Sequence, residues 1–151
     1  MRSATGVAGP SAEHGAEFVA RFADFWRAPT PERLAEVLTD DVTLDQPLAA
    51  PTHGLPAARA AFCHLFVLVP DLHAVVDRWS ARGEHVFIEF RLCGTFGGRA
   101  IEWPAVDRFT LRGERASERV SYFDPTPLLP HLARRPLAAL RWWWTARRPP
   151  A

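Results

Sequence analysis

Residues 99–124, RAIEWPAVDRFTLRGERASERVSYFD, are typical of two long strands joined by a tight turn at Arg112–Arg115. Side chains along a strand point alternately to its two faces. One face of the first strand therefore carries apolar residues and a single acid, namely Ile101, Trp103, Ala105, Asp107, Phe109 and Leu111. An acid in such surroundings is costly to ionise, because apolar neighbours cannot replace the water that it loses.

Asp107 is therefore the most informative residue of the chain. The sequence contains no Lys, and alternation puts Arg108 on the opposite face, so no cation is obviously placed beside the acid. We expect Asp107 to be a neutral acid that donates a hydrogen bond over part of the physiological pH range. The alternative is an Asp at a sheet edge that bonds a nearby backbone N–H.

The composition restricts the kinds of partner that the chain can have. Its 151 residues fit one domain with a hydrophobic core. With a net charge of +1, the chain has no overall electrostatic field that would attract nucleic acid, and no nucleic-acid partner is expected. All basic residues are Arg, which together with the many Ala and Pro residues suggests a GC-rich bacterial genome. No signal peptide or membrane span is visible, which predicts a cytoplasmic protein.

Three helices are predicted in the N-terminal half. The first spans residues 13–27 and places three Phe residues on one face. The second begins at Thr30, whose hydroxyl would cap it, and is closed by Asp40-Asp41. The third spans residues 56–69.

Strands are predicted over residues 42–46, 72–79 and 85–96, before the two strands described above. Residues 47–54 are expected to form a loop, while Arg82-Gly83 and Gly97-Gly98 are expected to form hairpin turns. This order predicts an α+β fold, in which a curved antiparallel sheet wraps around the three helices. Such a cone-shaped sheet would leave a cavity that suits a ligand.

The predicted domain spans residues 13–127, and both ends of the chain are expected to lie outside it. Residues 1–12 are small and contain Gly and Pro, which predicts a disordered tail. Residues 128–151 form an Arg/Trp-rich C-terminal tail, predicted to be helical, with Trp142-Trp143-Trp144 among its arginines. We favour a tail that caps the cavity or self-associates over one that contacts a membrane or stays disordered.

The two cysteines, Cys63 and Cys93, are predicted to be reduced core residues. They have no CxxC spacing and no suitable His cluster, so no metal site is expected. His53 and His64 could act as acids or bases near neutral pH, although a lone His on a helix is more often structural.

The order of elements, together with residues 40–54 (DDVTLDQPLAAPTHG) and 104–124, resembles the SnoaL-like members of the nuclear transport factor 2-like superfamily. The resemblance covers roughly residues 15–127. It implies a cone-shaped α+β fold but does not select one activity. The superfamily includes ketosteroid isomerases, limonene-type epoxide hydrolases, polyketide cyclases and dehydratases, as well as non-catalytic binding and dimerisation modules.

Comparison with the ketosteroid isomerases argues against their chemistry. Their general-base Asp matches Gln46, and an amide cannot take a proton at neutral pH. Their oxyanion-binding Tyr matches Phe22, while their protonated Asp matches Asp107. One of these three groups is retained, so steroid isomerisation is not expected.

The limonene-type epoxide hydrolases hold a water with an Asp–Arg–Asp arrangement. Their last Asp matches Ser121, and their other two residues match the apolar face of Ile88 and Phe90. Alternation turns Glu89 and Arg91 away from that face, as an exposed cross-strand ion pair. A register shift of one residue would bring both into the cavity.

The candidate site residues follow from these comparisons. Asp107 would be the general acid, Gln46 and Ser121 would position substrate or water, and Asp124 would act catalytically or bond the turn that follows it. The predicted substrate-binding residues are apolar or aromatic, namely Phe22, Trp26, Phe62, Ile88, Phe90, Trp103, Phe109 and Tyr122.

Two functions remain open. The first is a cofactor-independent enzyme that carries out acid/base cyclisation, isomerisation, dehydration or epoxide opening on a bulky apolar polyketide- or terpenoid-like molecule. The second is a non-catalytic module that binds an apolar ligand or only dimerises. For either, the resemblance implies a homodimer through the outer face of the sheet, near Phe87, Glu89 and Arg91.

Overall fold

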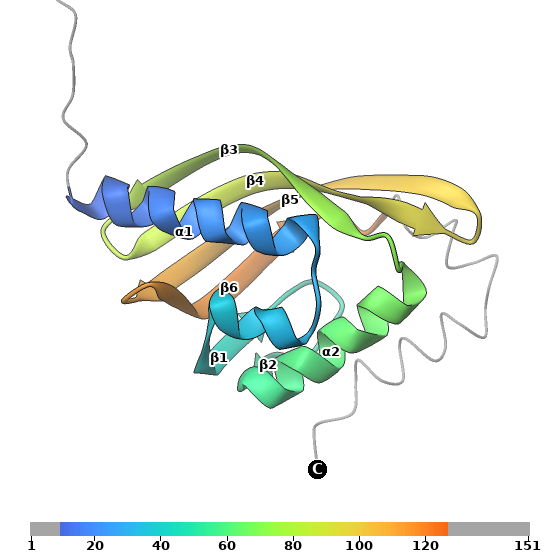
Figure 1. The fold of residues 1–151 in the computed structure, drawn as a ribbon, viewed down its shortest axis with the longest axis horizontal. Coiled ribbons are helices and arrows are strands. Elements are labelled where there is room, and N and C mark those ends of the chain that lie inside the picture. Colours follow the sequence, from blue (N-terminus) through green and yellow to red (C-terminus); the bar gives the residue numbers. More distant parts are fainter. Residues whose placement is uncertain (1–9, 127–151) are drawn as a thin grey trace, which may run out of the picture.

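A computed structural model describes residues 10–126, whose six strands form one curved sheet (Figure 1) in the order β2-β1-β6-β5-β4-β3. The elements along the chain are α1 (Pro10–Arg27), the 3-10 helix η1 (Glu32–Glu36), β1 (Leu38–Asp45), β2 (Thr52–His53), α2 (Leu55–Leu68), β3 (His73–Arg82), β4 (His85–Phe96), β5 (Arg99–Arg112) and β6 (Arg115–Phe123). Neighbouring strands are antiparallel except β1 and β6, which are parallel. The predicted α+β class and the curved sheet are confirmed.

The β4–β5 hairpin has the boundaries that the sequence predicts. Gly97 and Gly98 adopt φ values of 60° and 81°. A two-residue turn whose twist matches that of the strands requires positive φ at both of its residues. From this turn, β4 and β5 pair without interruption between Phe96–Arg99 and His85–Thr110. This hairpin fixes which side chains of β5 face the helices.

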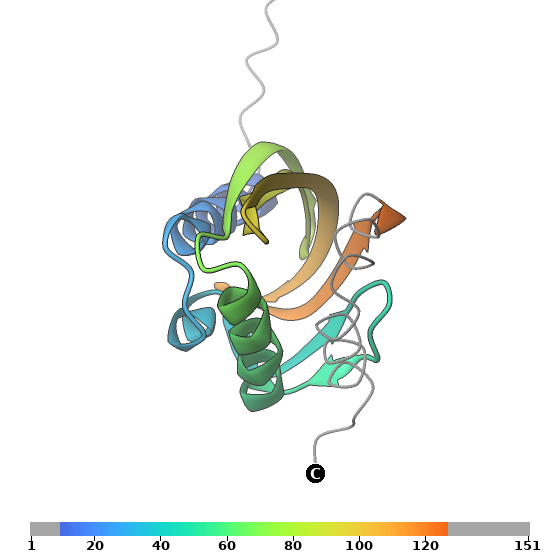
Figure 2. The ribbon, with the colours of Figure 1, turned by 90° about the vertical axis from the view of Figure 1, so that its right-hand side faces the viewer.

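The two α-helices lie on the open side of the curled sheet, as Figure 2 shows. Helix α1 packs along β3 and turns Phe18, Phe22 and Phe25 inward, where each is at most 4% exposed. A Cβ added at Gly15 would lie 2.6 Å from the Cβ of Ala81. The absence of a side chain at Gly15 is therefore what lets α1 approach β3 so closely.

The second predicted helix is wrong in length and type. Only the short η1 forms, and Asp40-Asp41 lies inside β1 rather than closing a helix. The Ala116 N–H of β6 donates to the Val37 carbonyl at 2.8 Å, and Leu38 pairs with Ala116. The residues immediately after η1 therefore pair with β6 as a strand instead of continuing the helix. The predicted loop at 47–54 also contributes the two-residue strand β2, which pairs with β1.

The predicted tails lie mostly outside the described residues. Residues 10–12 belong to α1, so the N-terminal helix begins three residues before the predicted boundary. The Arg/Trp-rich tail at 128–151 lies wholly outside them. Within residues 10–126, no helix combines the length and the apolar character needed to cross a membrane.

The close contact at Gly15 yields a stability prediction. We expect Gly15→Val to lower the free energy of unfolding by about 1–3 kcal/mol, because the added side chain overpacks the contact with β3. This loss should appear although Val is a better helix former than Gly. The control Ala20→Val lies on the exposed side of α1 and should change stability by less than about 1 kcal/mol. Urea denaturation measures both, and equal losses would contradict the tight packing.

Candidate functional site

One extra residue in β6 decides which of its side chains face the helices. Next to the turn, Leu111 pairs with Ala116. The following pair along the strands is Thr110 with Glu118, which leaves Ser117 unpaired as a β-bulge. A bulge changes the register by one residue and so turns every later side chain to the opposite face.

Beyond the bulge, an acid, a guanidinium and a hydroxyl lie together on the inner face. Asp107 pairs with Ser121 across the strands, and Arg119 precedes Ser121 by two residues on the same face. Arg119 Nε donates to Asp107 Oδ2 at 2.5 Å. The Ser121 hydroxyl donates to Asp107 Oδ1 at 2.6 Å, and Arg119 Nη2 donates to Ser121 Oγ at 3.2 Å. We call these three residues the Asp107 cluster.

The Asp107 cluster is sealed in the interior of the fold. Asp107 is 1% exposed, Ser121 3% and Arg119 8%, and no other charged residue with described burial is as deeply placed. The guanidinium of Arg119 also lies over the ring of Phe62 from α2, with its Cζ 5.8 Å from the ring centre. Strands β5 and β6 and helix α2 therefore all contribute to this site.

The expectation that no cation accompanies Asp107 is wrong. Arg119 comes from the neighbouring strand, which alternation along β5 alone could not identify. A carboxyl group that accepts hydrogen bonds from a guanidinium and a hydroxyl is stabilised in its charged form. The predicted burial of Asp107 is confirmed, and the predicted lack of a cationic partner is not.

Seven of the residues predicted to line a cavity are buried in the interior of the fold. Each is at most 8% exposed, and they are Phe22, Trp26, Phe62, Ile88, Phe90, Trp103 and Phe109. The ring centre of Phe22 lies 5.3 Å from that of Phe90 and 5.5 Å from that of Phe109. Trp26 and Phe62 are 6.1 Å apart. These rings contact one another in the interior of the fold.

The predicted residue Gln46 lies at the end of β1, the strand that pairs with β6. It follows β1 directly and is half-buried. In the parallel pairing of β1 and β6, Asp45 lies beside Val120. Continuing this register by one residue brings Gln46 level with Ser121. Within residues 10–126, its side-chain amide makes no hydrogen bond.

Asp124 and Tyr122 do not join the Asp107 cluster. Asp124 is exposed and accepts a hydrogen bond from the Thr126 N–H at 2.9 Å, which was the structural alternative. The hydrogen bonds from Thr126 hold the pKa of Asp124 below its usual value. Tyr122 is 55% exposed, because alternation turns it to the face opposite Ser121. The substrate-binding role predicted for Tyr122 in a conical pocket is therefore corrected.

Glu89 and Arg91 face away from the interior, in the register that alternation predicts. Glu89 forms an ion pair with Arg78 at 3.0 Å, and Arg91 forms one with Asp77 at 2.9 Å. Both are exposed cross-strand pairs on the outer face of the sheet. The arrangement used by limonene-type epoxide hydrolases is thus absent from the described inner face of β4.

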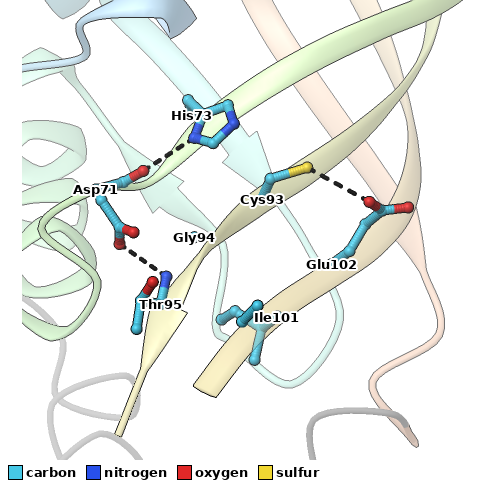
Figure 3. A pocket seen from close by; sticks show the side chains of 8 residues that line it. Asp71, His73, Cys93, Gly94, Thr95, Ile101 and Glu102 are labelled. Carbon is cyan, nitrogen blue, oxygen red and sulfur yellow. Dashed lines mark hydrogen bonds between the residues drawn. The ribbon is translucent and has the colours of Figure 1, made fainter. Parts of the chain in front are cut away.

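A separate pocket of about 350 Å³ lies at the other end of the β4–β5 hairpin. Figure 3 shows its polar side chains, among which Asp71 accepts a hydrogen bond from the Thr95 N–H at 2.7 Å. His73 bonds the Asp71 carbonyl at 3.0 Å, and the Cys93 thiol donates to Glu102 at 3.8 Å. None of the predicted site residues lines this pocket.

Neither cysteine lies in the hydrophobic core. Both are free, but Cys63 is exposed on α2 and Cys93 is half-buried, so the prediction of two core residues is wrong. Burial, followed by the charge of Glu102, raises the pKa of the Cys93 thiol, which makes it a weak nucleophile. Among the described residues, no three His, Cys, Asp or Glu side chains are placed to hold a metal ion. His53 and His64 are both exposed.

Arg119 is the functional candidate that the sequence analysis missed. Arg119 and Ser121 are two residues apart, so they must share a face of their strand. That spacing was a usable signal once Ser121 had been selected. It could not show that this face is the one that Asp107 also occupies, since the answer depends on the bulge at Ser117.

Comparisons with known proteins agree with this fold. The SnoaL-like domain matches residues 19–119 of the sequence. The structure resembles a putative SnoaL-like polyketide cyclase from Jannaschia sp. CCS1, with 23% identity, 83% of this chain and 95% of that chain covered, and a TM-score of 0.72. It also resembles a hypothetical protein with a ketosteroid isomerase-like fold from Catenulispora acidiphila, with 20% identity, 76% and 91% coverage, and a TM-score of 0.69. A putative polyketide cyclase from Bacillus cereus matches with 18% identity, 80% coverage of each chain and a TM-score of 0.66. No curated protein matches the sequence.

The buried ion pair yields a second stability prediction. We expect Arg119→Met to lower the free energy of unfolding by about 3–5 kcal/mol, because it leaves Asp107 charged and unpaired in the interior. The matched control Arg108→Met breaks the outer-face pair with Glu118, on the same two strands, and should cost about 1 kcal/mol or less. The double variant Asp107→Leu/Arg119→Met should recover most of the loss, because neither charge remains. Chemical denaturation measures the free energy of unfolding of the three variants. Equal losses in Arg119→Met and Arg108→Met would contradict this account.

Proposed function

Because the chain belongs to the SnoaL-like family, we propose that it is a cofactor-independent bacterial enzyme of the cytoplasm that performs acid/base chemistry on a small molecule. The reactions open to it are cyclisation, isomerisation, dehydration and epoxide opening. Its substrate would be bulky, apolar and oxygenated, as polyketide- and terpenoid-like molecules are.

The observation that carries this proposal is the Asp107 cluster. A carboxylate, a hydroxyl and a guanidinium meet in an interior made of aromatic rings. Hydrogen bonds and charges act more strongly in such surroundings than in water, and groups fixed there need no rearrangement during a reaction. Buried titratable groups held by specific partners are more frequent at active sites than elsewhere, although structural ion pairs share the feature.

The proposed role of Asp107, a general base, differs from the general acid that the sequence suggested. In the proposed mechanism, Arg119 holds one oxygen of Asp107, and the Asp107 carboxylate accepts a proton from substrate. The Ser121 hydroxyl, which already donates to Asp107, can relay that proton. Once protonated, Asp107 can return the proton to another atom of the same substrate, which is the sequence of steps that isomerisation and dehydration need.

Gln46 and the aromatic residues would bind the substrate. The free amide of Gln46 can hold a carbonyl oxygen or a water molecule near Ser121. Trp26 and Phe62, which lie next to each other on the Arg119 side of the interior, would contact its apolar body. Asp124 is retained only as a residue of the turn that follows β6.

A non-catalytic module that binds an apolar ligand or only dimerises is the second candidate. The observation that favours it is the mutual packing of Phe22 with Phe90 and Phe109 in the interior. In that case the Asp107 cluster would serve to orient β5 and β6.

We further propose that the chain forms a homodimer through the outer face of the sheet. This face exposes four large apolar side chains, each between 37% and 55% exposed, namely Val75, Phe87, Val106 and Tyr122. Val106 lies directly between Glu89 and Tyr122 in the strand register. Exposed apolar side chains interspersed with ion pairs on one face are suited to face a second copy of the same face.

Catalysis can be tested with 2-tetralone, a flat apolar ketone whose α-protons exchange with solvent. We expect the wild-type protein to accelerate deuterium incorporation, measured by NMR in D₂O. Asp107→Asn should reduce this rate by about 10²–10⁴-fold, because the amide cannot take the proton. Glu118→Gln, on the outer face of β6, should leave the rate unchanged. A wild-type rate equal to that in buffer would favour the binding module.

The dimer can be tested by light scattering at micromolar protein concentration. We expect a dimer for the wild type and a monomer for Val106→Arg, because a charge among the exposed apolar side chains of this face would lose its water on association. Val67→Arg, which changes a residue of α2 that is 74% exposed, should remain dimeric. A wild-type monomer would refute the proposed interface.

A further inference from the structure

Helix α2 turns an uncharged surface away from the sheet. Its buried side faces the strands, where Phe62 lies over the guanidinium of Arg119. The exposed residues of α2 contain no Asp, Glu, Lys or Arg, and they are Pro56, Ala60, Ala61, Cys63, His64 and Val67. We call these six residues the α2 surface. Val67 is 74% exposed, more than any other large apolar side chain with described burial.

The one arginine of α2 does not make this surface polar. Arg59 is half-buried, and its guanidinium donates to the carbonyl oxygens of Pro31 at 3.2 Å and Glu32 at 3.3 Å. It is therefore directed to η1 rather than to solvent. A helix on the surface of a globular protein normally carries charged or polar residues on its outward side, and a helix that is apolar on all sides is normally covered on all sides.

The remaining part of the chain, residues 127–151, has the composition that such a surface requires. This segment contains three of the six Trp residues of the chain and five arginines. All 17 acidic residues lie within residues 1–126. The segment is therefore purely cationic, while residues 1–126 carry more acids than bases. Opposite charges of this kind favour contact between the two parts.

The pattern of residues 136–146 (PLAALRWWWTA) predicts a helix with one apolar side. Pro136 is favoured in the first turn of a helix. Leu137, Leu140 and Trp144 follow at spacings of three and four residues, which places them on one side. A single Trp side chain can bury about 150–250 Å².

The segment is also long enough to reach α2. Strand β6 passes beneath this helix, since Phe62 contacts Arg119, and the described chain continues from there to residue 126. The ten residues 127–136 can span about 33 Å when extended. A helix of 14 residues, as α2 is, is about 21 Å long.

We propose that the α2 surface is the docking site of residues 137–146 of the same chain, with Leu137, Leu140 and Trp144 packed over Cys63 and Val67. The covalent connection favours this occupant over a second copy, because it gives the segment a high effective concentration at α2. The interaction stabilises the fold from outside the interior and does not depend on the proposed catalysis.

Cys63 reports whether the α2 surface is covered, because residues 10–126 leave it exposed. Alkylation by N-ethylmaleimide, followed by digestion and mass spectrometry, measures its rate of reaction in the full chain. We expect Cys63 to react at least about 10-fold more slowly in the wild type than in the triple variant Trp142→Ser/Trp143→Ser/Trp144→Ser. A tenfold difference corresponds to a docking free energy of about 1.4 kcal/mol. Cys93, on β4, should react at the same rate in both proteins.

Val67→Arg tests the same contact from the side of α2. The new cation lies in the α2 surface and repels the arginines of the segment, so Cys63 should react as fast as in the triple variant. The matched control Val106→Arg adds the same charge to the outer face of the sheet and should leave Cys63 protected.

The protection of Cys63 should be the same at low and high micromolar protein concentration, because both partners belong to one chain. Protection that appears only at high concentration would assign the α2 surface to a second copy. Protection that appears only when anionic phospholipid vesicles are added would assign it to a membrane. Either result, or equal rates for Cys63 in the wild type and both disrupting variants, would overturn the proposal.

Discussion

The ion pair between Asp107 and Arg119 is the interaction on which the inner face of the sheet depends. Each charge loses its water in the interior, and neither would be tolerated there without the other. Both side chains can meet only if β6 shifts its register at Ser117. The parallel partner β1 is irregular at the same level, since Leu38 pairs with Ala116 but Thr43 pairs with Glu118. Two strands, β1 and β6, thus change their register next to this buried contact.

The two faces of the β5–β6 hairpin carry ion pairs of different character. On the inner face, Asp107 and Arg119 are surrounded by rings and shielded from salt. On the outer face, Arg108 and Glu118 lie 3.2 Å apart and remain partly exposed, so solvent weakens their attraction. The same two strands therefore carry a buried ion pair on the inner face and a partly exposed ion pair on the outer face.

The aromatic interior determines what the Asp107 cluster can do. The rings of Phe22, Trp26 and Phe62 exclude water and lower the local dielectric constant, which strengthens each hydrogen bond of the cluster. Where the resemblance to ketosteroid isomerases calls for a catalytic Asp and Tyr, this chain has Gln46 and Phe22. The polar groups are concentrated on β5 and β6 instead, so an acid/base reaction here would use a different set of residues.

The sequence by itself determined the α+β class, the β4–β5 hairpin and the inward position of Asp107, because alternation and turn residues act within one segment. Gly97-Gly98 requires a tight turn, and the apolar face of β5 requires burial. The short η1 and the partner of Asp107 were decided only by the tertiary structure. Pairing register is a relation between two strands, and one unpaired residue, Ser117, reverses which face of β6 is buried. For that reason Arg119, which alternation from the turn would have placed outside, lies against the buried acid.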